Sequence, residues 1–217
     1  MNKIVTRSQI IVLGLIIFLF VMDVLLGSFL IRKAGDSTKL MLDERMLDIV
    51  ITAADMTDGD DLAGITDTDS NNDQYKKLCS TLSFFQNNTG LESIYAARKA
   101  NDNHIMLVAE EAAGIDGSFG DEIRDSEAIE LAFTGTSAVD RIPYSDNRGV
   151  FYCAYSPVWA SDGEIAGVIA ADFNAEWYEK QLKAYARSIR IVCLLYFLTG
   201  VIIIFAMYRA FGGRQHD

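Results

Sequence analysis

Two long stretches of apolar residues limit what this chain can fold into more than any other feature. Residues 10–31 contain Asp23 as their single charged residue, and residues 191–208 contain no charge. About 20 helical residues cross the roughly 30 Å hydrocarbon core of a bilayer. Both stretches are long enough, so the sequence predicts two transmembrane helices.

The first stretch has a cleaved signal peptide as its alternative, because Lys3 and Arg7 make a basic segment in front of it. The apolar part of a signal peptide normally holds about 7–15 residues and ends at small residues. Here the stretch is longer, and Leu-Gly-Ser-Phe at residues 26–29 is a poor cleavage site. We therefore expect a retained anchor.

Asp23 is the one costly residue in the two stretches. A carboxylate at the centre of a bilayer costs about 2.5–3.5 kcal/mol on insertion scales. We expect Asp23 to lie toward the outer interface or in a contact between helices. A proton or ion pathway would need charged partners in the second stretch, and residues 191–208 offer none, which disfavours a transporter.

Two spans place both ends of the chain on one side of the membrane, with residues 32–190 as the domain between them. Residues 1–9 and 209–217 are then short tails. The second tail is too short for a catalytic domain, so we expect the output to come from a partner or from a domain outside this sequence. Basic residues flank the spans equally on both sides, and this distribution does not set the orientation.

The charge of the chain lies mainly between the spans. The sequence has 30 acidic and 19 basic residues and a net charge of -11. Because an acidic surface repels phosphates, we expect no nucleic acid as a partner. Three cysteines are too few for a disulfide framework or a four-thiolate metal site. Cys79 and Cys153 either form one disulfide or remain two free thiols.

Apolar residues at helical spacing predict four helices in the domain. A helix over residues 36–58 continues from the first span, and Gly59 is expected to end it. Further helices cover residues 73–87 and 126–134, and a helix over residues 175–187 leads into the second span. Each end of the domain is thus expected to join a span through a helix.

Two pairs of strands are predicted between these helices. Residues 93–98 and 104–108 flank a short Asn-Asp-Asn turn, and residues 149–158 and 165–173 flank an Asp-Gly turn at residues 161–163. Strands joined by short turns pair in antiparallel fashion. The expected fold class is therefore α+β.

The last strand pair carries a resemblance to a known family. The chain resembles the Cache superfamily of extracytoplasmic sensor domains, also called PDC domains. The resemblance lies in the helix that leaves the first span and in three segments: residues 155–158 (Tyr-Ser-Pro-Val), residues 162–163 (Asp-Gly) and residues 165–173. The resemblance covers residues 33–188 and suits a single module. It implies a PAS-like antiparallel sheet with a long N-terminal helix, flanked by two transmembrane helices in a bacterial cell membrane. It also implies that residues 32–190 lie outside the cytoplasm and that the tails are cytoplasmic.

The resemblance implies a ligand site as well. In the amino-acid-binding branch of the superfamily, a Pro-Tyr-x-Asp segment and the Asp that ends the last strand contact the ligand. Tyr144, Asp146 and Asp172 occupy the matching positions here. That branch also has an upstream Arg-x-Trp-Tyr segment, which this chain lacks, since Trp159 and Trp177 are its only tryptophans and both lie downstream.

Further candidates for the site follow from the chemistry of small metabolites. An anionic ligand needs an arginine, an amine needs a carboxylate, and aromatic walls exclude water. The candidate cations and aromatic residues are Arg98, Arg124, Arg148, Tyr95 and Tyr152. Two candidates have structural alternatives, because Tyr152 could face the core or solvent and Asp172 could cap the following helix.

No catalytic constellation is visible in the sequence. His104 and His216 are the only histidines, and no glycine-rich nucleotide-binding motif is present. The acidic stretch at residues 67–72 lacks the Gly and Glu of an EF-hand loop. We therefore expect no enzyme activity, no cofactor and no metal.

The sequence as a whole predicts a membrane-anchored sensor, expected to be a homodimer. It would bind a small extracellular metabolite (an amino acid, a carboxylate or an amine) and pass the signal to a cytoplasmic partner by shifting the helix at residues 175–188 against that at residues 36–58. One alternative is the sensory part of a signalling enzyme, a diguanylate cyclase or a histidine kinase, whose catalytic domain lies beyond this sequence. A domain that docks another protein is a third possibility.

Overall fold

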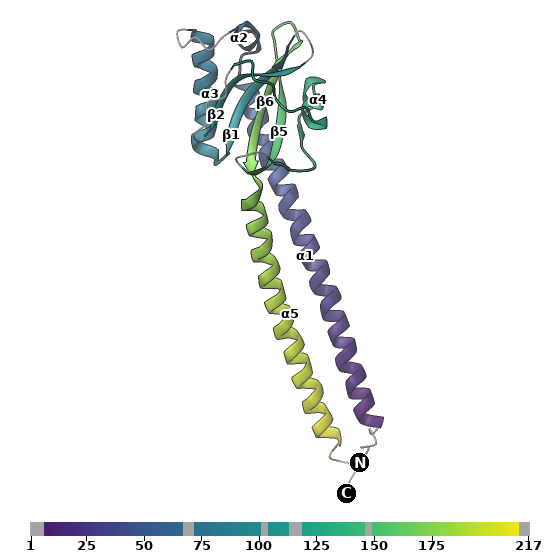
Figure 1. The fold of residues 1–217 in the computed structure, drawn as a ribbon. Helices are drawn as coiled ribbons and strands as arrows, with labels where there is room; N and C mark the ends of the chain where they lie inside the picture. Colours follow the sequence, from purple (N-terminus) through teal and green to yellow (C-terminus); the bar gives the residue numbers. More distant parts are fainter. Residues whose placement is uncertain (1–6, 67–71, 101–103, 113–118, 146–148, 213–217) are drawn as a thin grey trace. The chain divides into compact units, whose positions relative to one another are not determined.

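The chain forms two compact units, which we call the sheet unit and the helical unit. The sheet unit comprises Lys39–Tyr178, and the helical unit comprises the residues up to Thr38 and from Glu179 onward. Helices α1 (Arg7–Asp55) and α5 (Ala175–Gly212) each contribute to both (Figure 1). The computed structural model describes residues 7–66, 72–100, 104–112, 119–145 and 149–212.

The helical unit consists of the N-terminal part of α1 and the C-terminal part of α5, which run antiparallel. The rings of Phe20 and Phe197 meet edge to face with centroids 5.6 Å apart. Both helices are long and apolar enough to cross a membrane. The two apolar stretches predicted from the sequence are therefore helical along their whole length.

The sheet unit is built on a six-stranded antiparallel sheet. The strand order is β2-β1-β6-β5-β3, and β4 also pairs with β5 (Figure 1). β6 is the central strand, since it is bonded to β1 on one side and to β5 on the other. The strands are β1 (Ser93–Lys99), β2 (Ile105–Ala112), β3 (Ala138–Val139), β4 (Tyr144–Ser145), β5 (Val150–Trp159) and β6 (Ile165–Asn174).

The register of the strands assigns residues to the two faces of this sheet. Successive residues of a strand point to opposite faces. Ser93 and Cys153 both pair with Asp172, and one residue further on Tyr152 pairs with Phe173. We call the first face the site face; it comprises Ser93, Tyr95, Cys153, Tyr155, Ala170 and Asp172. We call the opposite face the helix face; it comprises Ile94, Ala96, Tyr152, Ala154, Ile169, Ala171 and Phe173.

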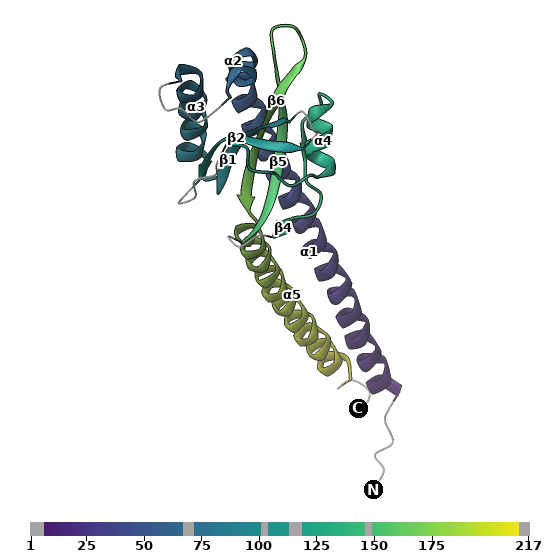
Figure 2. The ribbon, with the colours of Figure 1, turned by 45° about the horizontal axis from the view of Figure 1, so that its top comes forward.

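Different helices cover the two faces. The short helix α4 (Glu127–Phe133) packs on the site face through its small and apolar residues, Ala128, Ile129 and Ala132. The last turns of α1 lie behind the sheet on the helix face (Figures 1 and 2). The α1 residues buried there recur at helical spacing and are Leu42, Met46, Ile49, Val50 and Ala53.

Local sequence explains where the other helices begin. α3 (Asp73–Thr89) starts at Asn72, whose side-chain oxygen accepts a hydrogen bond from the Gln74 amide at 2.9 Å. Ser126 caps α4 in the same way by accepting from the Ile129 amide. These caps explain why both helices begin where the sequence predicts.

The prediction for the end of α1 was wrong. The helix ends at Asp55, and Gly59 opens a separate short helix, α2 (Gly59–Gly64), which is capped by the Asp58 side chain. Gly59 is needed because a Cβ atom there would lie 2.3 Å from the carbonyl oxygen of Trp159. The glycine thus allows α2 to approach the hairpin of β5 and β6 rather than ending a helix.

The predicted fold class is confirmed. The sheet unit is α+β, with a long N-terminal helix and an antiparallel sheet whose four long strands match the predicted ranges closely. The sequence did not reveal α2 or the two-residue strands β3 and β4, because such short segments carry no periodic pattern.

Candidate functional site

A buried carboxyl group lies at the centre of the site face. Asp172 is 1% exposed and comes from the end of β6. The hydroxyl of Ser93 donates a hydrogen bond to its Oδ2 at 3.0 Å, and the hydroxyl of Tyr144 donates to the same oxygen at 2.6 Å. The strand register explains the first contact, because Ser93 and Asp172 are direct partners across β1 and β6. The second contact links β4 to β6 over the intervening strand.

A thiol and a phenol lie beside this carboxyl group. Cys153 is the partner of Asp172 on β5, and its Sγ lies 3.6 Å from the Tyr95 hydroxyl. Burial raises the pKa of both Cys153 and Tyr95 well above their ordinary values. Both groups therefore keep their protons and remain neutral hydrogen-bonding groups at neutral pH.

A second buried carboxyl group, that of Asp140, holds an arginine near the first. The Arg124 guanidinium donates to Asp140 Oδ2 at 3.1 Å, and the Tyr155 hydroxyl donates to the same oxygen at 3.3 Å. The guanidinium carbon of Arg124 also lies 4.9 Å from the centroid of the Tyr144 ring. Arg124 thus bridges the segment before α4 to the tyrosine that contacts Asp172.

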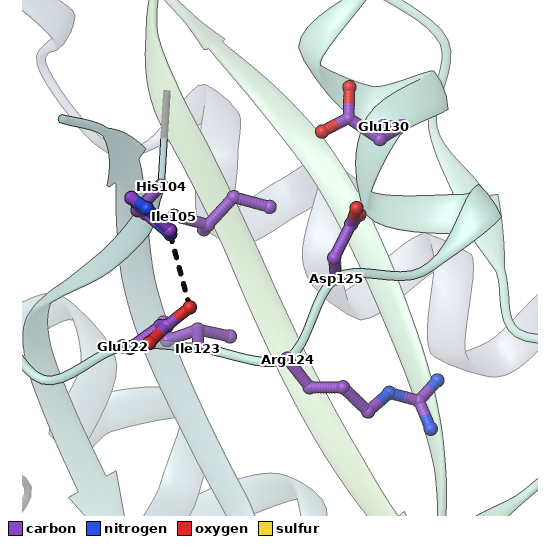
Figure 3. Close-up of a pocket in the computed structure, with 7 residues that line it drawn as sticks. All are labelled: His104, Ile105, Glu122, Ile123, Arg124, Asp125 and Glu130. Carbon is purple, nitrogen blue, oxygen red and sulfur yellow. Dashed lines mark hydrogen bonds and ion pairs between the residues drawn. The ribbon is translucent and has the colours of Figure 1, made fainter. Parts of the chain in front are cut away.

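An open cleft of about 370 Å³ lies next to Arg124 (Figure 3). Its polar lining includes the pair of His104 Nδ1 and Glu122, 3.1 Å apart, and Glu130, which is bonded to Lys99. Figure 3 shows the Arg124 side chain pointing away from the His104–Glu122 pair. The full lining is His104, Ile105, Glu122, Ile123, Arg124, Asp125 and Glu130.

The structure brings together four of the residues that the sequence suggested. The four residues that lie on or over the site face are Tyr95, Tyr144, Asp172 and Arg124. Asp146 and Arg148 lie outside the described residues.

Two other candidates point to the opposite side of the sheet. Arg98 donates to the carbonyl oxygen of Ala63 at 3.0 Å, at the C-terminal end of α2. Tyr152 lies on the helix face, where the Lys39 Nζ is 4.4 Å from its ring centroid and the Tyr178 ring is 5.8 Å away. Both side chains therefore have structural partners away from Asp172.

The structure also decides two alternatives that the sequence left open. Asn174 rather than Asp172 accepts the hydrogen bond of the Glu176 amide at the start of α5, at 2.8 Å. Neither Cys79 nor Cys153 forms a disulfide. Asp172 therefore does not cap α5, and the neighbouring Cys153 is not held in a disulfide.

Sequence reasoning missed Ser93, Asp140 and Tyr155. Ser93 and Tyr155 stand at alternate strand positions on the same face as Asp172, so a pattern of polar residues at every second position could have suggested them. Asp140 had no such signal, because it follows the two-residue strand β3. Within the residues that the structure describes, no group of three His, Cys, Asp or Glu side chains is close enough to hold a metal.

Comparison with known proteins finds similarity in fold. The chain aligns with the sensor domain of the V. cholerae histidine kinase DctB with a TM-score of 0.58 and 17% identity, over 73% of this chain and 59% of that one. It also aligns with the sensory domain of the Campylobacter jejuni chemoreceptor Tlp3 (TM-score 0.51, 14% identity), over 76% of this chain and 66% of that one. The same Tlp3 domain in complex with L-valine matches with a TM-score of 0.50 and 14% identity, over 77% of this chain and 66% of that one. The fold of this chain is therefore similar to that of these sensory domains.

These similarities have a limited reach. The chain spans less than two thirds of the length of these sensory domains. No protein-family model matches the sequence, and no curated protein matches it. Identities of 14–17% describe a shared fold, so the ligand and the output of this chain have to be argued from its own residues.

Proposed function

We propose that this chain is a membrane-anchored sensor that binds a small extracellular metabolite on the site face of its sheet. The observation that carries the proposal is the buried carboxyl group of Asp172, which accepts hydrogen bonds from the buried Ser93 and the half-buried Tyr144. It stands at the end of β6, which leads directly into α5. A ligand held there would act at the point where the sheet unit continues into an apolar helix.

The ligand is proposed to compete with Tyr144 for Asp172. The tyrosine hydroxyl occupies Oδ2 of Asp172 at 2.6 Å, so an incoming ammonium or hydroxyl group would replace it and move β4. Arg124, already positioned by Asp140, would meet an anionic group of the same ligand. An α-amino acid carries both groups, and L-valine is the ligand in the Tlp3 complex. An amino acid is therefore the first class to test, before simple carboxylates and amines.

The sensor is proposed to sit outside the cytoplasm between two spans, at residues 10–31 and 191–208, with short cytoplasmic tails and a cytoplasmic partner. The length and apolar composition of α1 and α5 support two spans. A membrane-impermeant thiol reagent should label a cysteine introduced at Asp162, on the β5–β6 hairpin, in intact cells. Labelling only after the cells are opened would contradict this orientation.

A ligand screen tests the proposed site directly. A ligand at 100 times its dissociation constant should stabilise the protein by about 2.7 kcal/mol, which a thermal shift detects. The Asp172→Asn variant should lose the shift, whereas Asp162→Asn on the exposed hairpin should keep it. A shift that survives in Asp172→Asn would place the ligand elsewhere, and no shift with any amino acid, carboxylate or amine would favour the docking of a protein.

The signal is proposed to cross the sheet through neighbouring residues. Phe173 follows Asp172 and pairs with Tyr152 on the helix face. The Arg45 guanidinium lies 5.9 Å from the Phe173 ring, and the Trp177 ring lies 5.6 Å from it. A displacement of Asp172 would therefore change contacts to α1 and to the start of α5 together.

Crosslinking tests this transmission. Gly35 lies against Leu182 in the helical unit, so cysteines at these two positions in an otherwise cysteine-free chain should form a disulfide. The ligand found in the screen should change the rate of this reaction, and Asp172→Asn should abolish the change. A rate that ignores a ligand known to stabilise the protein would refute transmission by helix displacement.

The sensory part of a signalling enzyme is the second candidate, since the matching DctB domain belongs to a histidine kinase. The coding sequence beyond Asp217 discriminates between the two. An in-frame catalytic domain would establish this candidate, and a stop codon would favour a separate signalling partner.

A further inference from the structure

Four basic residues lie at the ends of the two apolar stretches that lead to the sheet unit. Arg32 and Lys33 directly follow the first stretch, and Arg187 and Arg190 closely precede the second. All four side chains are exposed. Membrane proteins usually carry their excess of basic residues on the cytoplasmic side, so four such residues on the proposed outer side call for a physical reason.

The two helices place these residues near one depth. Gly35 of α1 lies against Leu182 of α5, and Gly27 lies against Cys193 further along the antiparallel pair (Figure 1). The four basic residues fall between these two contacts, and at about 1.5 Å per residue each lies within about 6 Å of its apolar stretch. The headgroup layer of a bilayer is about 5–8 Å thick on each side. All four residues therefore reach this layer, and we call them the basic belt: Arg32, Lys33, Arg187 and Arg190.

Within the described part of the chain, no acidic side chain neutralises the basic belt. None of its four side chains forms an ion pair or a hydrogen bond with another described residue. On α5 the last acidic residue is Glu179, which pairs with Lys183. On α1 the nearest is Asp36, and it is not paired with the belt. Because like charges at one depth repel one another, the belt is left to be neutralised from outside the chain.

We propose that the basic belt binds the phosphate groups of anionic phospholipids in the leaflet next to the sheet unit. A guanidinium group donates two parallel hydrogen bonds to the oxygens of one phosphate. Acyl chains hold the lipid headgroups at the depth of the belt, whereas a soluble anion is dilute there, so the lipid is the fitting partner. Bound headgroups would fix the depth at which α1 and α5 leave the membrane.

Two lysines on the same side of α5 provide a matched control. Lys180 and Lys183 precede Arg187 and Arg190 at spacings of three and four residues, so all four lie along one face of the helix. Both lysines are exposed, but at about 1.5 Å per residue they lie about 12–17 Å beyond the apolar stretch. They are therefore outside the headgroup layer, and Lys183 is bonded to Glu179, which lies further still from the stretch.

The proposal rests on the proposed function only for the insertion of both helices in a membrane; it does not require a ligand on the site face. The test uses the full chain in vesicles of phosphatidylcholine and phosphatidylglycerol. Spin-labelled forms of the two lipids are compared by the fraction of each that the chain immobilises, at about 0.1 M salt, where charges act over about 10 Å.

The unaltered chain should prefer phosphatidylglycerol. The double change Arg187→Gln and Arg190→Gln should lower this preference about fivefold or more, since each basic residue near an anionic surface contributes about that factor. The double change Lys180→Gln and Lys183→Gln should leave it unaltered. Replacement of both arginines by lysine should keep most of the preference, because the charge remains.

Each outcome decides the question. A loss in the arginine-to-glutamine variant but not in the lysine-to-glutamine variant supports the proposal. No loss in the former, equal losses in both, or an equally large loss in the arginine-to-lysine variant would each overturn it.

Two further comparisons separate the possible failures. Sodium phosphate should displace no more labelled lipid than sodium chloride at the same ionic strength, and a larger displacement would make a soluble anion the partner instead of the lipid. A chain that immobilises neither lipid disproves the anchoring itself. A chain that immobilises both lipids equally disproves only the contact with anionic headgroups.

Discussion

The two faces of the sheet come from the same strands but bury different chemistry. On the site face, Asp172 and Asp140 are buried with hydroxyl and thiol groups around them, beside the apolar cluster that includes α4. On the helix face, Ile94, Ile169 and Ala171 are fully buried, and cations of α1 lie over aromatic rings. One face combines a polar network with an apolar cluster, and the other buries mainly apolar side chains.

This difference indicates how binding and stability are divided between the two faces of the sheet unit. Apolar contacts hold α1 on the sheet whatever occupies the opposite face, since burial of apolar surface is nondirectional. Hydrogen bonds on the site face depend on geometry and can be exchanged for bonds to a ligand. Asp172 on the site face and Phe173 on the helix face are consecutive residues of β6. The face with exchangeable hydrogen bonds and the face with stable apolar contacts therefore share one backbone.

The largest expected effect comes from breaking the helix face. Ile169→Ala removes a fully buried side chain and should lower the free energy of unfolding by about 2–5 kcal/mol. Urea unfolding followed by tryptophan fluorescence measures it. Cys153→Ala, its counterpart on the site face, should cost clearly less because fewer atoms are removed. Equal losses would show that the two faces contribute alike to stability.

A smaller effect is expected from the polar network. Tyr144→Phe removes the hydroxyl that donates to Asp172 and should cost about 1–3 kcal/mol, since a buried acceptor loses a partner. The same change should tighten binding of a ligand that competes for Asp172, which calorimetry can measure. Tyr185→Phe, at an exposed position of α5, is the control and should change neither quantity. Weaker ligand binding in Tyr144→Phe would mean that the hydroxyl contacts the ligand instead.

High pH should weaken the site face selectively. Burial raises the pKa of Cys153 and of Tyr95, so the folded protein keeps protons that the unfolded chain releases above about pH 8.5 and pH 10, respectively. Their contribution is complete at lower pH and declines as pH rises, by up to about 1.4 kcal/mol per pH unit for each group. Unfolding midpoints between pH 7 and 11 should therefore fall, and Cys153→Ala should delay the onset toward pH 10. An unchanged onset in that variant would exclude the thiol as the cause.

The smallest expected effect concerns the cations of the helix face. Lys39→Gln removes the ammonium group over the Tyr152 ring and should cost about 0.5–1 kcal/mol. If this contact transmits the signal, ligand affinity should persist while the ligand-dependent crosslinking between positions 35 and 182 declines. Lys183→Gln, whose exposed side chain pairs with Glu179 on α5, is the matched control. A crosslinking response that Lys39→Gln leaves intact would confine the contact to a structural role.

The sequence by itself determined most of the elements and their order. Apolar composition defined the two long helical stretches, β-rich runs around an Asp-Gly turn identified β5 and β6, and Ser126 marked the start of α4. These features depend on neighbours within a few residues, so they can be read locally. The resemblance in residues 155–173 then led to a Cache-like fold, which the structure supports with the matching sheet and helix order.

The tertiary structure decided which residues meet. Arg98 and Tyr152 were reasonable candidates by residue type, yet the strand register turns them to the helix face, while it brings Ser93 and Cys153 to Asp172. Asp140 reaches Arg124 and Tyr155 only because the short strand β3 pairs with the edge of β5. A shift of one residue in a strand exchanges its two faces, and that shift is set by pairing between distant segments, which no local pattern in the sequence records.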